Sequence, residues 1–505
     1  MTVVLCAVVA FLLLPSAAHA ATPAPPGWEQ PEDLGSLSAV RQMVRADAGP
    51  AAGFTGAGVG VALIDSGVVP VEGLRDGVVL GPDLSLDAPQ PGLRQRDAYG
   101  HGTHLAGIIA GGDGDSPAGL RGIAPDATLL PVKVAASDGA VDVSQVIAAI
   151  DWVVTHRDEH NIRVLALAYG TDSTQPSRID PLAHAVESAW RAGIVVVVAA
   201  GNQGQATSSL TSPASDPWVL AVGSSDHGGT LSQADDTVSS FSNRGTARKP
   251  DLVAPGRSVV SLRVPGSFLD VRHPEARVGE QQFRGTGTSQ ATAVVAGAAA
   301  LLLEQRPSLT PDEVKQLLVA NAAGLRGVPR GQQGAGLLDV AAAAGARPRP
   351  LPGAQAREHS TGTGSLEAAR GSAHIARDGI ELNGERDVFG QPWDGRTWAP
   401  LASAGRAWTD GSWNGSAWTD SFRNDQSSST ARTAPATPLN GVTWSGVTWS
   451  GVTWSGVTWS GVTWSGVTWS GVTWSGVTWS GVTWSGVTWS GVTWSGVTWS
   501  GVTWS

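Results

Sequence analysis

Four polar side chains that could take part in nucleophilic chemistry stand at the ends of apolar segments. Asp65 and Asn202 each follow an apolar run, and His101 opens a helical segment. Ser289 begins the long apolar run 291–303, which is typical of a buried helix. A serine hydroxyl becomes a strong nucleophile when a base, an orienting acid and donors for an oxyanion surround it. These residues therefore predict a serine that attacks a carbonyl carbon.

The elements that must position these residues alternate between strands and helices. Near-continuous apolar runs predict parallel strands buried on both faces, at 59–64, 129–134, 164–168 and 194–199. Between them, apolar residues at helical spacing predict covering helices. One helix has Asp180 as its cap and Pro181 in its first turn. The sequence therefore predicts an α/β fold, a doubly wound and mainly parallel sheet with helices on both faces. Catalytic groups collect at the carboxyl ends of such strands.

Each of these motifs also has a purely structural explanation. Asp65 and Asn202 could each stabilise a turn after a strand, which is a common use of both residue types. Ser289 could belong to a helix cap. His101 and His104 would share one helix face, so their spacing leaves both histidines open as the base.

Taken together, the motifs resemble those of the subtilisin-like serine proteases, the subtilases. The matching stretches are Val61-Ala62-Leu63-Ile64-Asp65-Ser66-Gly67, Gly100-His101-Gly102-Thr103-His104-Leu105-Ala106-Gly107, Ala199-Ala200-Gly201-Asn202 and Gly287-Thr288-Ser289. The resemblance spans residues 53–344 and selects His101 over His104. It implies a triad of Asp65, His101 and Ser289, with Asn202 completing the oxyanion hole.

The resemblance also implies how a substrate binds. A polypeptide substrate would pair as an extra strand with Ala168, Tyr169 and Gly170. The first specificity pocket would be walled by Ala199, Ala200 and Gly201. Gln290 and Ala293 stand where the family usually has methionine and proline, and we interpret both as changes in packing.

No cofactor is implied for catalysis. The resemblance implies structural calcium, but Asp113 and Asp115 are too few and too scattered to assign a site, so we predict no metal ligand. A net charge of -10 argues against a nucleic-acid partner.

The length of 505 residues predicts a catalytic domain with an appendage. We predict a signal peptide at 1–20, a lead-in at 21–52, a peptidase domain at 53–345, a linker with a small hairpin at 346–389, degenerate Gly-x-x-Trp repeats at 390–440 and a repeat tail at 441–505. The apolar run 3–14 followed by Ala18-His19-Ala20 predicts export. We therefore expect a secreted protein, extracellular or associated with the cell wall, with a monomeric catalytic domain. The lead-in is too short for the inhibitory propeptide of many exported subtilases.

The tail consists of 13 copies of Gly-Val-Thr-Trp-Ser, and 18 of the 22 tryptophans lie beyond residue 390. Valine, threonine and tryptophan favour strands, whereas glycine at every fifth position disfavours a helix. The tail would wind as a small solenoid or stay a flexible ribbon. We expect this aromatic array to bind a surface such as cell wall or carbohydrate. Two functions remain, an exported serine endopeptidase with a surface-binding tail and a catalytically silent adhesion or matrix protein. The intact motifs favour the endopeptidase.

Overall fold

The computed structural model describes residues 33–74, 77–112, 120–204, 207–349, 355, 357–377 and 380–417, together with short strands between residues 439 and 504. The chain divides into two compact units, residues 1–426 and residues 427–505, and each is described by itself. The predicted signal peptide, Asp113 and Asp115 lie outside the described residues.

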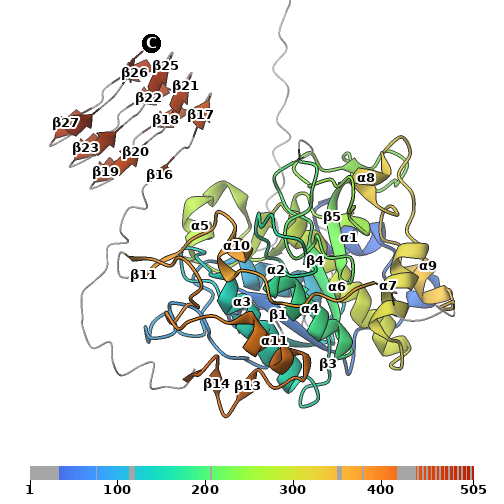
Figure 1. The fold of residues 1–505 in the computed structure, drawn as a ribbon. Coiled ribbons are helices and arrows are strands. Elements are labelled where there is room, and N and C mark those ends of the chain that lie inside the picture. Colours follow the sequence, from blue (N-terminus) through green and yellow to red (C-terminus); the bar gives the residue numbers. More distant parts are fainter. Residues whose placement is uncertain are drawn as a thin grey trace, which may run out of the picture. The chain divides into compact units, whose positions relative to one another are not determined.

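A seven-stranded sheet organises the first unit (Figure 1). Strands β2, β1, β3, β4 and β5 lie in that order and are all parallel. Strand β7 continues the sheet in parallel beside β5, and the short β6 pairs with β5 antiparallel. The strands are β1 (Gly60–Asp65), β2 (Thr128–Lys133), β3 (Ile162–Leu167), β4 (Val195–Ala199), β5 (Leu220–Asp226), β6 (Thr237–Val238) and β7 (Leu252–Pro255). All residues of β1 and β4 are buried, as their apolar sequences predict.

Helices cover the sheet on both faces, which confirms the predicted fold class. The long α6 packs across β3, β4 and β5 with α2 alongside it, and α3 packs along α4 (Figure 1). The helices are α1 (Leu37–Met43), α2 (His101–Ala110), α3 (Val143–His156), α4 (Pro181–Arg191), α5 (Phe268–Arg272), α6 (Thr288–Gln305), α7 (Pro311–Ala320), α8 (Arg330–Gln333), α9 (Val340–Gly345), α10 (Leu366–Arg370) and α11 (Gly395–Ser403). Asp142 caps α3, and Asp180 caps α4 with Pro181 at its first position.

A smaller antiparallel sheet adjoins α2. It has the order β8-β10-β9 and consists of β8 (Val259–Leu262), β9 (Arg277–Val278) and β10 (Gln282–Gly285). Gly285 ends β10 only four positions before Ser289, so this sheet leads the chain directly into α6.

The lead-in segment is part of the first unit rather than a separate piece. Leu37 and Val40 of α1 belong to the main hydrophobic core. The buried guanidinium of Arg41 donates to the carbonyl oxygen of Ile123 at 2.8 Å and to the carboxylate of Asp47 at 2.7 Å. Residues 33–52 are therefore held by burial and by satisfied polar groups.

Residues 357–417 also pack against the peptidase domain, and we call this segment the extension. It contains α10, the hairpin β11 (Ala376–Arg377) and β12 (Ile380–Glu381), α11, and the three-stranded sheet β13 (Trp408–Thr409), β14 (Ser412–Trp413) and β15 (Ser416–Ala417). Its tryptophans 393, 398, 408 and 413 are buried in the same core as the central sheet. From the sequence we predicted a linker with a small hairpin and a repeat array here. The hairpin is β11 and β12, and these described residues also cover α3 and α4 (Figure 1). The physical reason is that four large indole side chains find an apolar surface on those helices.

The second unit contains short parallel strands, one in each copy of the repeat. They are β16 (Leu439–Asn440), then β17 (Thr443–Ser445) to β28 (Thr498–Ser500), each a Thr-Trp-Ser segment, and β29 (Thr503–Trp504). Strand β17 pairs with β21 and β21 pairs with β25, so each strand pairs with the strand four copies later. Identical residues are therefore in register in each pair among β17 to β29, as in Thr443 opposite Thr463, whereas β16 places Leu439 opposite Trp459.

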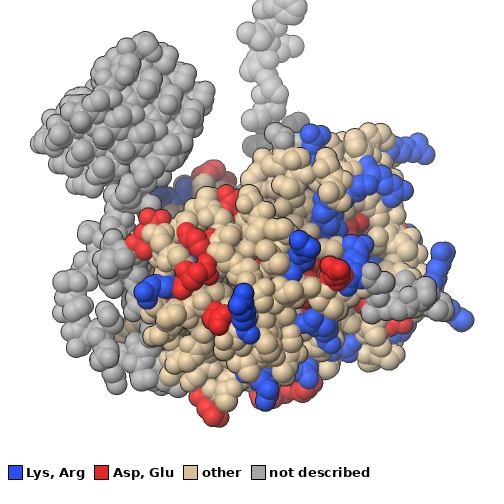
Figure 2. All heavy atoms as spheres, viewed as in Figure 1, with Lys and Arg blue, Asp and Glu red and all other residues tan. Residues whose placement is uncertain are grey.

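Acidic and basic side chains are interspersed on the face of the first unit shown in Figure 2, with wide uncharged areas between them. Among the described residues, no helix is both long enough and apolar enough to span a bilayer.

Candidate active site

Asp65 and His101 meet where β1 ends and α2 begins. Asp65 is the last residue of β1, and His101 is the first residue of α2. His101 Nδ1 lies 2.9 Å from Asp65 Oδ1 and 3.0 Å from Oδ2. The Asp65 side chain is 7% exposed and the imidazole 23% exposed, so the carboxylate is covered while the ring still reaches solvent. A carboxylate in this position fixes the orientation of the ring and leaves Nε2 for chemistry.

Ser66 and Asp97 hold this pair in place, and the sequence analysis did not identify either role. Asp97, which is fully buried, accepts hydrogen bonds from Gly100 N at 2.6 Å and from Thr103 N at 2.7 Å, so it caps α2. The Ser66 hydroxyl lies 2.8 Å from Asp97 Oδ1 and accepts from Gly102 N at 2.9 Å. Asp97 stands four positions before His101, outside the cap position of α2 that Gly100 occupies, so the capping pattern of the sequence does not reveal it.

Two glycines allow α2 to approach β1 this closely. A side-chain carbon on Gly102 would lie 2.1 Å from the carbonyl oxygen of Gly67, which no residue tolerates. Gly100 has φ +100°, a conformation that favours glycine. The glycines beside His101 therefore have a steric reason to be there.

The two histidines of α2 differ in their surroundings. Burial lowers the pKa of His101, but the charge of Asp65 and its hydrogen bond outweigh burial, so the net pKa is raised. His104 is buried, and burial together with the nearby His101 lowers its pKa to about 3. His104 is consequently neutral throughout the physiological range, and it is His101 that lies against a carboxylate.

Ser289 lies in the first turn of α6, beside Asn202. Gly287 precedes the helix, and the side chain of Ser289 is largely buried. Asn202 Oδ1 accepts hydrogen bonds from Thr288 N and from the Thr288 hydroxyl, both at 2.9 Å. These two bonds fix the amide so that its oxygen faces α6 and its nitrogen is the free end.

Two N–H donors border the space over Gly287. A side-chain carbon added there would lie 3.4 Å from Asn202 Nδ2 and 3.7 Å from Ser289 N, with the acceptor Gln290 Oε1 at 3.0 Å on another side. Because glycine has no such carbon, this space stays open to both donors. An oxygen that develops negative charge here could accept from a side-chain amide and a backbone amide at the amino end of a helix.

The amino ends of α2 and α6 come together at Gly285. A side-chain carbon on Gly285 would lie 2.6 Å from His104 Nε2 and 2.5 Å from Gln290 Nε2. His104 is one turn after His101, and Gln290 directly follows Ser289. Helix α2 also packs along α6. His101 and Ser289 therefore belong to one edge of the molecule, at the carboxyl end of β1.

Comparison with known proteins agrees with this geometry. Residues 56–338, more than half of the chain, match the model of the subtilase family (Peptidase S8). The chain belongs to the subtilase family. Subtilases are serine-type endopeptidases, and the first unit carries their domain.

Two relatives, compared by sequence, support the same assignment. Serine protease AprX of Bacillus subtilis is 41% identical over 274 residues, which are 52% of this chain and 61% of AprX. The chain thus spans less than two thirds of AprX. Subtilisin DY of Bacillus licheniformis is 32% identical over 304 residues, which are 60% of this chain and 96% of that protein. A crystal structure of a cold adapted subtilisin-like serine proteinase is 31% identical, covers 57% of this chain and 89% of its own, and has a TM-score of 0.43. The family match ends before the extension begins.

In this subtilase, the predicted substrate-binding residues lie on two neighbouring segments. Ala168, Tyr169 and Gly170 continue past the end of β3, and Ala199, Ala200 and Gly201 end β4 or follow it. Residues 211 and 212 join the two segments. Thr211 N donates to the carbonyl oxygen of Ala200 at 3.3 Å, and Thr171 and Ser212 exchange two backbone hydrogen bonds at 2.8 and 2.9 Å.

Glycine is required at the points where these segments come closest. A side-chain carbon on Gly170 would lie 2.5 Å from Thr211 Oγ1, and one on Gly201 would lie 2.9 Å from Thr211 Cγ2. Gly201 also has φ +109°. Thr211, which the sequence analysis missed, therefore contacts both segments.

The family resemblance implies structural calcium, so we looked for clusters of side chains that could hold a metal ion. Among the residues that the structure describes, no three histidine, cysteine or acidic side chains gather in this way.

Proposed function

We propose that this chain is a secreted serine endopeptidase whose acyl-enzyme forms on Ser289. The observation that carries the proposal is the contact of His101 Nδ1 with Asp65 at 2.9 Å. The Ser289 amide, which shares an open space with Asn202 Nδ2, supports it. Ser66 and Asp97, which hold the start of α2 rigidly, add support because catalysis depends on preorganised groups.

The reaction begins with Ser289 Oγ attacking the carbonyl carbon of the scissile peptide bond. His101 takes the hydroxyl proton as Oγ forms its bond to carbon, and Asp65 stabilises the resulting imidazolium. Asn202 Nδ2 and Ser289 N donate to the oxyanion of the tetrahedral intermediate. The intermediate collapses, the C–N bond breaks, and His101 returns the proton to the leaving amine. Water then hydrolyses the ester by the same steps, which restores the Ser289 hydroxyl.

The substrate would be a polypeptide in an extended conformation. Its backbone would pair with Ala168, Tyr169 and Gly170, and the side chain before the scissile bond would enter the pocket walled by Ala199, Ala200 and Gly201. Pairing through backbone groups gives affinity with little sequence selection. We therefore propose a protease with broad specificity.

The tail would hold the enzyme at a surface outside the cell. It is free of charged residues and repeats one aromatic unit 13 times. Aromatic faces stack on sugar rings and other flat apolar surfaces, and repetition multiplies weak contacts through effective concentration. We propose cell wall or another carbohydrate as the partner, with the catalytic domain acting as a monomer and no nucleic acid involved.

Active-site labelling separates this function from that of a silent adhesion protein. A fluorophosphonate probe should form a covalent bond with Ser289 in the native full-length chain, and neither the Ser289→Ala variant nor heat-denatured protein should react. A native chain that fails to react would exclude the endopeptidase and leave adhesion as the function. Mass spectrometry of the labelled peptide would identify the modified residue directly.

A further inference from the structure

The loop that follows the substrate-binding residues is lined by the extension. Residues 171–180 connect Gly170 to the start of α4, and residues 360–372 of the extension lie along this loop. The bonds between the two are Thr361 N to Arg178 O at 2.8 Å, Gly364 N to Ile179 O at 2.6 Å, Gln175 Nε2 to Ser365 O at 3.0 Å, Thr171 Oγ1 to Ala369 O at 2.7 Å and Ser372 N to Asp172 Oδ1 at 2.7 Å. The loop is therefore anchored along its whole length.

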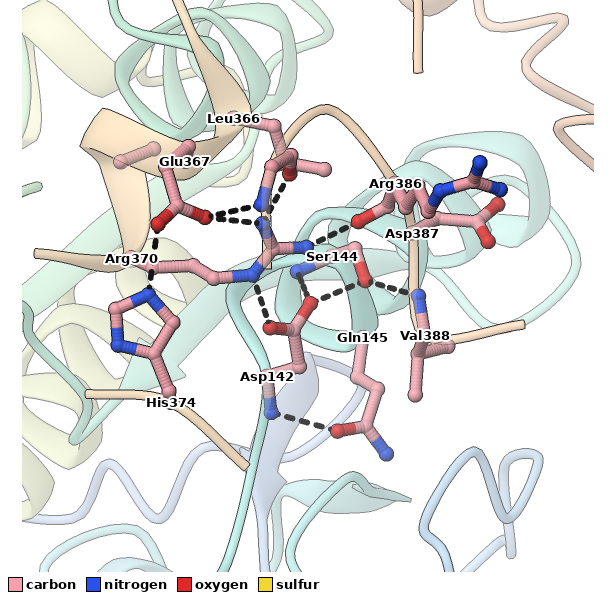
Figure 3. A network of polar contacts seen from close by, with 12 residues as sticks. Asp142, Ser144, Gln145, Leu366, Glu367, Arg370, His374, Arg386, Asp387 and Val388 are labelled. Atoms are coloured by element: carbon pink, nitrogen blue, oxygen red, sulfur yellow. Dashed lines mark hydrogen bonds and ion pairs between the residues drawn. The ribbon is translucent and has the colours of Figure 1, made fainter. Parts of the chain in front are cut away.

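Arg370 anchors this part of the extension to the peptidase domain (Figure 3). Its side chain and that of Asp142 are both completely buried, and Nε donates to Asp142 Oδ2 at 2.6 Å. The other guanidinium nitrogens donate to the carbonyl oxygens of Gly384, at 2.7 Å, and Arg386, and to Glu367 at 3.1 Å. A buried arginine with every nitrogen paired resists displacement, because moving it would leave charges unpaired in the core.

Asp142 links Arg370 to the start of α3. Its second oxygen, Oδ1, accepts from Ser144 N at 2.8 Å and so caps the helix, while Gln145 Oε1 accepts from Asp142 N at 2.7 Å. The Ser144 hydroxyl in turn accepts from Val388 N of the extension at 2.9 Å (Figure 3). The extension and the start of α3 thus form one rigid polar network.

The end of α10 lies directly against the loop 171–180. Gly371 has φ +65°, and a side-chain carbon there would lie 2.0 Å from Asp172 Oδ1. Only glycine allows α10 to end directly against the loop. The hydroxyl of Ser372 then donates to Asp172 Oδ2 at 2.6 Å.

Thr171 connects this brace to the substrate-binding residues. It directly follows Gly170, its hydroxyl is held by Ala369, and its backbone pairs with Ser212. The neighbouring Thr211 bonds to Ala200 in the opposite wall of the predicted pocket. A shift of Thr171 would therefore move both segments between which a peptide is expected to lie.

We propose that residues 360–372 act as a brace that sets the position of the substrate-binding residues 168–170, with Thr171 and Arg370 as positioning residues. This inference rests on the proposed function. An extended peptide pairs with these residues through hydrogen bonds that tolerate little displacement. A preformed edge also avoids the entropy cost of ordering the loop when a peptide binds. The brace therefore determines how tightly long substrates bind and leaves the chemistry at Ser289 unaltered.

Thr171→Val tests the brace, with Thr155→Val as the matched control. Both substitutions replace a hydroxyl by a methyl group, and the hydroxyl of Thr155 likewise reaches the extension, at Gly405 O, but on α3 and away from the loop. Each full-length variant is assayed on a tetrapeptide anilide, which reaches along residues 168–170, and on a single-residue ester, which does not.

We expect Thr171→Val to lower kcat/KM for the tetrapeptide roughly five- to tenfold through a higher KM, because one hydrogen bond is lost. The ester should change less than twofold, and Thr155→Val should leave both substrates within twofold. An equal loss on both substrates, or a tetrapeptide KM that stays at the parent value, would overturn the brace.

Arg370→Met should raise the KM for the tetrapeptide more than Thr171→Val does, again with little change for the ester. Because this change alone leaves Asp142 buried without its partner, the double variant Arg370→Met/Asp142→Asn is measured beside it. A folded double variant with the parent KM for the tetrapeptide would refute the role of Arg370. Fluorophosphonate labelling of the parent protein is measured in the same experiment. If the parent labels and cleaves normally while the variants show no dependence on substrate length, only the brace is wrong; if the parent does not label, the proposed function itself fails.

Discussion

Asp151 makes the docking of the extension depend on pH. This carboxylate lies on α3, is buried, and accepts hydrogen bonds from the indole nitrogens of Trp398 at 2.7 Å and Trp413 at 2.8 Å. Burial raises its pKa to about 7, although both indoles favour the charged form and work against the rise. We predict that Asp151→Asn, which keeps an oxygen acceptor but cannot ionise, removes a pH dependence from the free energy of unfolding.

Whether the free energy of unfolding rises or falls with pH follows from the direction in which the pKa of Asp151 is shifted. A carboxyl group whose pKa is higher in the folded state stabilises the fold fully below its unfolded pKa of 3.8, and this contribution is lost as pH rises through about 7. Since one pKa unit corresponds to about 1.4 kcal/mol, the whole contribution is about 4 kcal/mol, of which about 2 kcal/mol is lost between pH 5 and pH 7, where Asp151 is half ionised in the folded state. The loss should level off about one pH unit higher, where Asp151 is ionised in both states.

Urea unfolding measures this difference, in a Ser289→Ala background that prevents self-digestion. The free energy of unfolding of Asp151→Asn minus that of its parent should rise by about 2 kcal/mol between pH 5 and pH 7. Asp312→Asn is the control, since Asp312 also accepts from an indole nitrogen, that of Trp190, at 2.8 Å but is only partly buried. If Asp151→Asn followed the same pH profile as its parent, the argument from burial would be refuted.

Three further predictions concern catalysis and the tail. Ser289→Ala should lower turnover on peptides about 10⁶-fold, the loss found for the same change in subtilisin, and Asn202→Ala about 10²- to 10³-fold; near-parent hydrolysis by either purified variant would contradict the mechanism. Because the pKa of His101 is raised and the base must be neutral, kcat/KM should fall as pH drops through a value above 6.5, and a rate flat to pH 4 would exclude a histidine base. Deleting residues 441–505 should leave cleavage of a short peptide within about twofold while releasing the enzyme from cell-wall fractions, and unchanged retention would disprove the anchor.

The fold of the peptidase domain could be predicted because local patterns decide it. The apolar run 195–199 forms β4, and the Asp180 cap with Pro181 starts α4 at the expected residue. Such elements can be predicted from neighbouring residues, because a strand buried on both faces has a continuous apolar sequence and a helix often begins at a capping residue. Asp65 and His101 were accessible to the same reasoning because each stands at the end of an element.

The extension could not be predicted, because its contacts join residues that are far apart in the chain. The bond from Arg370 to Asp142 spans 228 positions, and the bond from Trp413 to Asp151 spans 262. In the sequence alone, Arg370, Asp142 and Asp151 cannot be told from solvated charges, and Trp413 cannot be told from a surface aromatic residue. The hydroxyl of Ser66 and the wall residue Thr211 were missed for a related reason, since their roles depend on geometry across neighbouring strands and helices.

The buried tryptophans of the extension indicate what a Gly-x-x-Trp unit requires from its partner. Two of these tryptophans stand in Gly-x-x-Trp units and donate a hydrogen bond: Trp398 donates its N–H to Asp151 at 2.7 Å, and Trp408 donates its N–H to the carbonyl oxygen of Ala148 at 2.7 Å. The indole N–H of Trp393, in the unit that begins at Gly390, is buried and has no hydrogen-bond partner among the described residues. The units of Trp398 and Trp408 thus combine an apolar surface with a hydrogen-bond acceptor, the usual need of a buried indole. A partner for the perfect copies should offer both features at once. Carbohydrate does so through the flat faces of its rings and its hydroxyl groups, whereas a purely hydrophobic surface would leave every indole N–H unpaired.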